Sequence, residues 1–277
     1  MLEALTVLLK VALYAGLLSA SGAAFAQATL RLLPDEAAHL THVMRRGAVL
    51  ILCACPLIQL VLIQQLSGEF DRATLTAVFA SSSGAALFLQ MTGAALLLMS
   101  STDDEAVLVR LSYALLPMLG FAFSGHAAGI GPVEGSVAVV HVSLAAWWVG
   151  SLYSLRRGCA HSQLDRLVVV ISRFSSVAFI STGALVIAGL VLVMILVDFN
   201  NDPWLSPYGQ ILGAKLCIVG VVLGLASYNR RRLTPRLLAG DGTALKTLQR
   251  TINVELGLIA AVLAVTAILT TYTSPHD

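Results

Sequence analysis

Charged side chains are scarce in this sequence. They make up 12% of its 277 residues, whereas a soluble domain carries about 25%. The net charge of +2 indicates neither an acidic nor a basic partner, and nothing predicts binding to nucleic acid. The sequence also lacks a nucleotide-binding P-loop, a soluble domain with a phosphorylated-aspartate motif and a glycine-rich dinucleotide fingerprint, which excludes ATP hydrolysis and dinucleotide chemistry. No nucleophile, base and orienting acid occur together, so we expect that the protein is not an enzyme.

Long apolar runs are abundant instead. Hydrophobic residues make up 57% of the chain, and the mean hydropathy is +0.86. Runs of about 20 apolar residues can cross a bilayer as helices, and hydrocarbon leaves backbone polar groups no partner outside a helix. We predict eight such spans, over residues 5–29, 47–66, 75–100, 106–124, 136–155, 167–197, 209–228 and 252–271. Residues 1–277 are therefore predicted to form a single all-α, polytopic transmembrane bundle.

The basic residues predict how the bundle is oriented. Alternate connections and the span ends beside them hold 14 of the 17 lysines and arginines, namely Arg31, Arg45, Arg46, Arg110, Arg156, Arg157, Arg166, Arg173, Arg230, Arg231, Arg232, Arg236, Lys246 and Arg250. The other side has only Arg72, while Lys10 and Lys215 fall inside predicted spans. By the positive-inside rule, the arginine-rich connections are cytoplasmic. We expect a multi-pass protein of the bacterial inner membrane with both termini in the periplasm.

The N-terminal segment resembles a secretory signal. The stretch SGAAFAQ (residues 21–27) looks like a small-residue cleavage site after an apolar run. However, the preceding region carries Glu3 and has no basic residue before Lys10, and cleavage would leave Arg31, Arg45 and Arg46 outside, against the charge rule. We expect an uncleaved first helix.

Two histidines flank the turn between the fourth and fifth predicted spans. His126 follows the outward-running span, and His141 lies about a turn and a half inside the next one. Ionisable residues at membrane depth are costly and usually face the bundle interior or a site, and imidazole binds copper, zinc, iron and nickel. Either histidine could instead bond a backbone carbonyl near a helix end. The pair predicts a metal or cofactor site at the outer face.

Two further candidate ligands lie on the same side. Met194 and Asp198 are four residues apart, so they share a helix face. A thioether is a soft ligand for Cu(I), although methionine also fills cores well. We favour ordinary packing for Met194.

The second span carries two cysteines beside a proline. Residues 53–56 read CACP, and Cys53 and Cys55 do not share a face of a regular helix. Pro56 disturbs the helix, and a kink there can turn both sulfurs towards one point. The cysteines are then soft metal ligands, or else two small buried residues beside a structural kink. The four cysteines of the chain predict no disulfide framework.

The second half of the chain resembles a known family. The segments RFSSVAFISTGALVIAGLVLVMIL (173–196) and WLSPYGQILGAKLCIVGVVLGLASYNRRRLTPRL (204–237) are similar to the membrane domain of the copper resistance protein D (CopD) family. The RFS start, Gly189, SPYG, Lys215, Asn229 and Pro235 carry the likeness. HVSLAAWWVGSLYSL (141–155) and GHAA (125–128) also fit, so the CopD-like core is expected at about residues 120–237.

The resemblance implies an eight-helix inner-membrane protein that moves copper from periplasm to cytoplasm. It also implies a small periplasmic copper-binding partner of the CopC type, and functional roles for His126 and His141. Cys53 and Cys55 are not implied by the family. Because the chain has no methionine-rich outer segment, capture from a separate copper carrier is expected.

These observations combine into one transport hypothesis. Cu(I) binds at His126 and His141 with Met194 or Asp198, while Trp148, seven residues after His141, lies on nearly the same helix face. The ion then passes Met91 and leaves past Cys53 and Cys55.

Two alternatives stay open. The histidines could be axial ligands of a b-type haem in an electron-transfer protein, or the protein could bind copper as a docking or sensing subunit without transporting it. The sequence does not determine the oligomeric state.

Overall fold

The computed structural model describes residues 2–30, 32, 34–66, 70–100, 106–124, 131–161, 164–197 and 203–273. Within these residues every regular element is helical. In chain order the elements are α1 (Leu2–Thr29), α2 (Pro34–Leu66), α3 (Arg72–Phe79), α4 (Ser82–Met99), α5 (Val107–Leu119), η1 (Gly120–Phe123), α6 (Pro132–His161), α7 (Leu164–Leu196), η3 (Pro203–Leu205), α8 (Pro207–Tyr228), η4 (Asn229–Leu233), α9 (Thr234–Leu238) and α10 (Thr243–Tyr272). The turns η1 and η3 are 3₁₀-helical, and η4 is π-helical.

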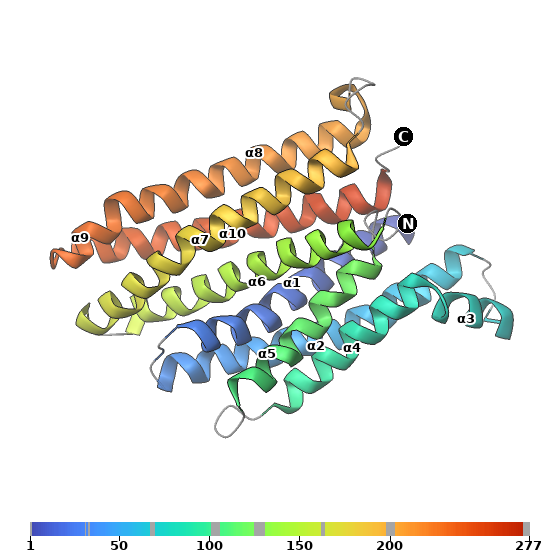
Figure 1. The fold of residues 1–277 in the computed structure, drawn as a ribbon, viewed down its shortest axis with the longest axis horizontal. Helices are drawn as coiled ribbons and strands as arrows, with labels where there is room; N and C mark the ends of the chain where they lie inside the picture. Colours follow the sequence, from blue (N-terminus) through green and yellow to red (C-terminus); the bar gives the residue numbers. More distant parts are fainter. Residues whose placement is uncertain are drawn as a thin grey trace.

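The long helices run back and forth along one direction, as Figure 1 shows. In the part of the chain that the structure describes, seven helical segments are long and apolar enough to cross a membrane, and a shorter apolar helix spans Val107–Phe123. Many large apolar side chains point outward, such as Leu8, Phe88 and Ile180 at 68%, 68% and 75% exposed. An apolar exterior of this extent fits lipid rather than water. The protein is therefore a polytopic, all-helical membrane protein.

The two ends of the bundle differ in charge. Helix α1 begins and α10 ends at the same end, which we call the terminal end (Figure 1). The opposite end, which we call the arginine-rich end, carries the basic residues Arg45, Arg46, Arg110, Arg156, Arg157, Arg230, Arg231, Arg232, Arg236, Lys246 and Arg250. The charge asymmetry predicted from the sequence is thus a property of the folded bundle.

Helix α1 lies at the centre of the bundle and packs against α2, α5, α6 and α10. Its small residues permit this, because a Cβ at Gly22 would overlap the carbonyl of Ala146 on α6, and a Cβ at Gly150 would overlap the carbonyl of Gly22. Close backbone approach through small residues is a common way for membrane helices to associate. The SGAA stretch that resembles a cleavage site is therefore accounted for by packing, with Ser21 and Ala23 fully buried.

The third predicted span, over residues 75–100, is wrong as a single helix. It divides into α3 and α4 at Ala80–Ser81. Asp71 caps α3 by accepting a hydrogen bond from the Thr74 amide at 2.8 Å, and the Ser81 hydroxyl caps α4 by accepting one from the Gly84 amide at 3.4 Å. Polar side chains that satisfy free backbone amides start new helices, and an apolar run alone does not reveal that break.

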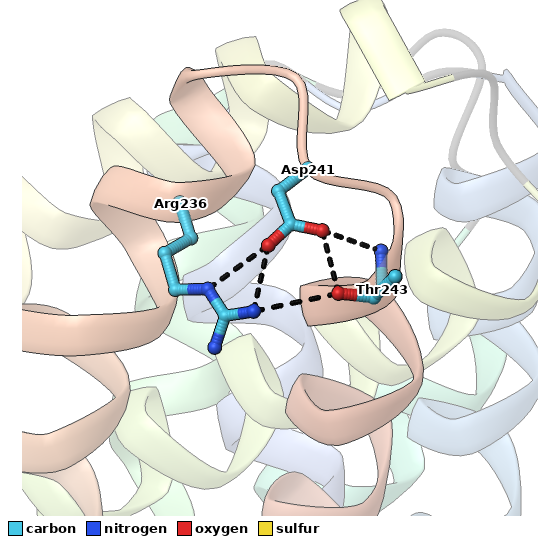
Figure 2. A network of polar contacts seen from close by, with 3 residues as sticks. All are labelled: Arg236, Asp241 and Thr243. Atoms are coloured by element: carbon cyan, nitrogen blue, oxygen red, sulfur yellow. Dashed lines mark hydrogen bonds and ion pairs between the residues drawn. The ribbon is translucent and has the colours of Figure 1, made fainter.

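The connection before α10 is shorter than the sequence indicated. Residues 229–238 stay helical, so only Ala239–Gly242 separate α9 from α10, and Gly240 takes the left-handed conformation (φ 83°) that favours glycine. Figure 2 shows Asp241 holding this turn: its carboxylate accepts hydrogen bonds from Arg236 Nη2 at 2.7 Å and from the Thr243 hydroxyl at 2.6 Å. These contacts lower the pKa of Asp241 to about 2.

Candidate functional site

His141 on α6 is held against α7. Its Nδ1 lies 3.2 Å from the carbonyl oxygen of Leu185. A Cβ built at Gly189, one helical turn further along α7, would lie 3.0 Å from His141 Cε1. The absence of a side chain at Gly189 therefore lets the imidazole lie flat against the backbone of α7.

This contact fixes which ring nitrogen of His141 is available. A carbonyl oxygen only accepts hydrogen bonds, so the Nδ1 that faces Leu185 must carry the proton. In the neutral imidazole, Nε2 then keeps its lone pair. Metal-binding histidines are commonly oriented in this way, by donating their other N–H to a carbonyl or carboxylate.

His141 lies deeper than the sequence indicated. Helix α6 begins at Pro132 rather than at residue 136, so His141 is nine residues, or about 14 Å, from the start of its helix at the terminal end. Lys215 on α8 is eight residues, or about 12 Å, from the start of its own helix at the same end. The two residues therefore lie at a similar depth from the terminal end.

The other predicted outer ligands do not complete this site in the described residues. His126 and Asp198 lie outside the residues that the structure describes. Met194, on α7, is 73% exposed, so its thioether faces outward from the bundle. The structure shows no contact between Met194 and His141.

Trp148 lies beside a carboxylate that is not among the predicted site residues. Glu255 on α10 is only 1% exposed and accepts a hydrogen bond from Asn229 Nδ2 at 2.6 Å. The indole of Trp148 lies against the same carboxyl group, although its Nε1 makes no hydrogen bond of good geometry. We call these three residues the Glu255 site. An acidic residue inside an apolar span was the available signal, because such residues are costly and usually functional.

Cys53 and Cys55 point to different surroundings. Helix α2 remains helical through Pro56, and a regular helix separates residues two apart. Cys55 is 3% exposed, and its thiol donates to Gln90 Oε1 on α4 at 3.4 Å, whereas Cys53 is exposed. The kink expected at Pro56 does not bring the two sulfurs to one point.

Met91 lies in a different part of the bundle from His141. It is on α4, which packs against α2, α3, α5 and η1, whereas α6 packs mainly against α1 and α7 and also against α10, η1, α2 and α5. Met91 and Cys55 therefore lie on the α2–α4 side, and His141 and Trp148 on the α6–α10 side, while α1 packs against both α2 and α6. In the described residues, no group of three or more histidines, cysteines or carboxylates is close enough to hold a metal ion.

The fold and charge pattern define the class of this protein as a multi-pass helical membrane protein. Residues 168–269 match the model of a protein family described as Copper resistance protein D. Over this segment the chain is similar to the CopD family. No curated protein sequence and no solved structure matches the chain.

The matched segment does not coincide with the resemblance seen in the sequence. It starts at residue 168 and ends at 269, whereas the resemblance was placed at about 120–237. It includes α8 and most of α7 and α10, and with them Leu185, Gly189, Asn229 and Glu255. His126 and His141 precede it, so their roles as ligands stay predictions.

Proposed function

We propose that this protein carries copper ions across the bacterial inner membrane, from periplasm to cytoplasm. The positive-inside rule makes the arginine-rich end cytoplasmic and the terminal end periplasmic. If α5 and η1 together form a crossing, the chain spans the bilayer eight times, and both termini are periplasmic. Copper enters at the terminal end and leaves at the arginine-rich end.

The observation that carries this proposal is the orientation of His141. Its Nδ1 faces the Leu185 carbonyl, so Nε2 is the nitrogen available to a metal. Both α7 residues that position the ring, Leu185 and Gly189, lie inside the segment that matches the CopD family.

The copper ion bound here is Cu(I), with His126 as the second ligand in the proposal. Imidazole suits copper, and a pair of neutral nitrogen ligands adds no charge to the membrane interior. Asp198 remains a candidate third ligand, and a small periplasmic copper-binding protein of the CopC type supplies the ion. Lys215 lies at the same level and opposes a cation, but its long stem can carry the ammonium towards the terminal end as copper enters.

The test compares the wild-type protein with the single variant His141→Ala and the double variant His126→Ala, His141→Ala. Anaerobic Cu(I) binding to purified protein and copper uptake into proteoliposomes are measured on the same preparations. His42→Ala is the matched control, because His42 is exposed on α2 near the arginine-rich end. We expect binding and uptake to fall in the His141 variants and to stay unchanged in the control.

Each other outcome has a definite meaning. Unchanged uptake in the double variant contradicts the entry site. Binding without uptake in the wild-type protein indicates a docking or sensing subunit. A Soret band that disappears with His141 indicates the haem-binding alternative.

A further inference from the structure

Glu255 is a carboxyl group inside the bundle with no positive partner. It lies twelve residues, or about 18 Å, from the start of α10 at the arginine-rich end. Within the described residues the ion pair found is Arg236–Asp241, and none involves Glu255. Its contacts are Asn229 and Trp148. An isolated carboxylate in an apolar interior is so unfavourable that such a group normally takes up a proton.

The basic residues of the neighbouring elements do not reach Glu255. On η4, Arg230 donates to the Ser175 carbonyl at 3.0 Å and lies 4.6 Å over the ring of Phe179 on α7, while Arg231 and Arg232 are exposed. On α9, Arg236 is held by Asp241.

The other helices around Glu255 offer no cation either, since Lys215, the basic residue of α8, lies fourteen residues before Asn229. Arg250, on α10 itself, is exposed. The nearest cations of α6 are Arg156 and Arg157, two turns or more beyond Trp148. In α1 the single basic residue is Lys10, which donates to the Thr270 carbonyl at the terminal end.

The geometry at Asn229 supports a protonated acid. The contact between Asn229 and Glu255 Oε1 is 2.6 Å, which is short for an N–H···O bond and typical of O–H···O. Asn229 Oδ1 is buried without a partner. Because the oxygen and nitrogen of an amide are assigned rather than observed, turning the amide places Oδ1 against Glu255. A carboxylic acid O–H then donates to it.

The backbone beside this contact is also unusual. Asn229 begins the π-helical turn η4, which continues α8 into α9. Single π-helical turns occur frequently at functional sites, and here the turn brings Asn229 to Glu255. The arrangement joins α6, α8 and α10 through one carboxyl group.

We propose that Glu255 binds a proton in the resting protein and releases it to the cytoplasm when a copper ion passes Trp148. This inference rests on the proposed copper transport. Trp148 is on nearly the same face of α6 as His141, seven residues closer to the arginine-rich end. One positive charge arrives and one proton leaves, so the charge of the apolar interior does not change.

The chemistry of the Glu255 site favours a proton over copper as its occupant. Carboxylate and amide oxygens are hard donors, whereas Cu(I) prefers sulfur and imidazole. Glu255 therefore loses its proton when copper passes, but it does not bind the ion.

Infrared spectroscopy tests proton binding without copper. A protonated carboxylic acid has a C=O stretch distinct from that of a carboxylate. We expect this band in the wild-type protein at neutral pH, its loss in Glu255→Gln and its retention in the control Glu3→Gln, since Glu3 is exposed. Asn229→Leu removes the hydrogen-bond partner and should shift the band. Equal spectra for wild type and Glu255→Gln would overturn the inference, as would a band that Asn229→Leu leaves in place.

Addition of Cu(I) tests the link to transport. We expect the band to decrease as copper binds, and proteoliposomes containing a pH dye to report proton release with copper uptake in the wild type but not in Glu255→Gln. A band insensitive to bound copper means that the proton is not exchanged. If the wild-type protein neither binds nor carries copper, the proposed function is wrong, and so is the copper-linked release of a proton. The spectra recorded without copper still decide whether Glu255 holds a proton.

Discussion

Gly189 on α7 leaves the space that the imidazole of His141 on α6 occupies. A Cβ at Gly189 would come within 3.0 Å of His141 Cε1 and 3.4 Å of Nδ1. Both distances are close to or below van der Waals contact, so the ring would have to move. The hydrogen bond from Nδ1 to Leu185 depends on the same position of the ring.

Replacement of Gly189 by alanine should therefore weaken copper binding. Displacing a group that orients a metal ligand costs about 10-fold or more in affinity, and we expect a loss of about 10-fold in Cu(I) binding to Gly189→Ala. Gly183→Ala is the matched control on the same helix, because a Cβ there meets nothing within 4 Å. Competition with a Cu(I) chelator measures both affinities.

Equal affinities for Gly189→Ala and Gly183→Ala would show that the position of the His141 ring does not matter for copper. The proposed entry site would then lose its main structural support, even if His141→Ala itself binds less copper.

The two cysteines of α2 should respond differently to substitution. Cys53 is exposed, whereas Cys55 is buried and donates to Gln90. We expect Cys53→Ser to leave Cu(I) binding and thermal stability unchanged. Cys55→Ser should leave copper binding unchanged but alter stability by about 1 kcal/mol, because a buried hydroxyl replaces a weakly polar thiol. Binding and thermal unfolding in detergent measure both effects.

A loss of copper binding in either cysteine variant would contradict the expectation that Cys53 and Cys55 do not bind copper. It would restore the hypothesis that Cys53 and Cys55 form an exit site, and it would require α2 to change shape around Pro56.

The sequence predicts the helices of this fold well where hydrophobicity decides them. The predicted spans 5–29 and 209–228 agree with α1 and α8 to within a few residues at each end. Prediction of helix ends fails where a polar cap starts a new helix, as at Ser81. It also fails where a helix continues beyond the apolar run, as in the first turns of α2 and in η4. Length and apolar composition do not encode those features.

The predicted site shows a similar division. His141 was found because an ionisable residue in an apolar span is costly. Glu255 gives the same signal, and the structure shows that its partner is Asn229. Which face of α10 turns inward, and which helix meets it, depends on long-range packing that no local pattern reveals.

Close contact between α1 and α6 predicts a strong effect of one methyl group. A Cβ at Gly150 would overlap the carbonyl oxygen of Gly22, so the two central helices would have to separate. We expect Gly150→Ala to destabilise the protein by about 1–3 kcal/mol, the usual cost of overpacking. Gly257→Ala is the control, since a Cβ there meets nothing within 4 Å. Thermal unfolding in detergent compares the two.

A Gly150→Ala variant as stable as Gly257→Ala would mean that α1 and α6 do not pack backbone to backbone. The central position of α1 would then be wrong, together with the packing explanation of its small residues.

The turn between α9 and α10 should lose order at acid pH. Asp241 accepts hydrogen bonds from Thr243 and Arg236, which lower its pKa to about 2 from the usual value of 3.8. Because the folded pKa is the lower one, the ionised carboxylate stabilises the turn above pH of about 4 and this contribution is lost as pH falls towards about 2.

Hydrogen exchange of residues 239–243 measures that contribution directly. The Thr243 amide donates to Asp241 Oδ1 at 2.9 Å, so its protection, corrected for the intrinsic rate at each pH, should fall on acidification in the wild type. In Asp241→Ala the protection should be low at every pH, while the Glu3→Gln control should behave like the wild type. If Asp241→Ala protects the Thr243 amide as well as the wild type does at neutral pH, the carboxylate does not hold the turn.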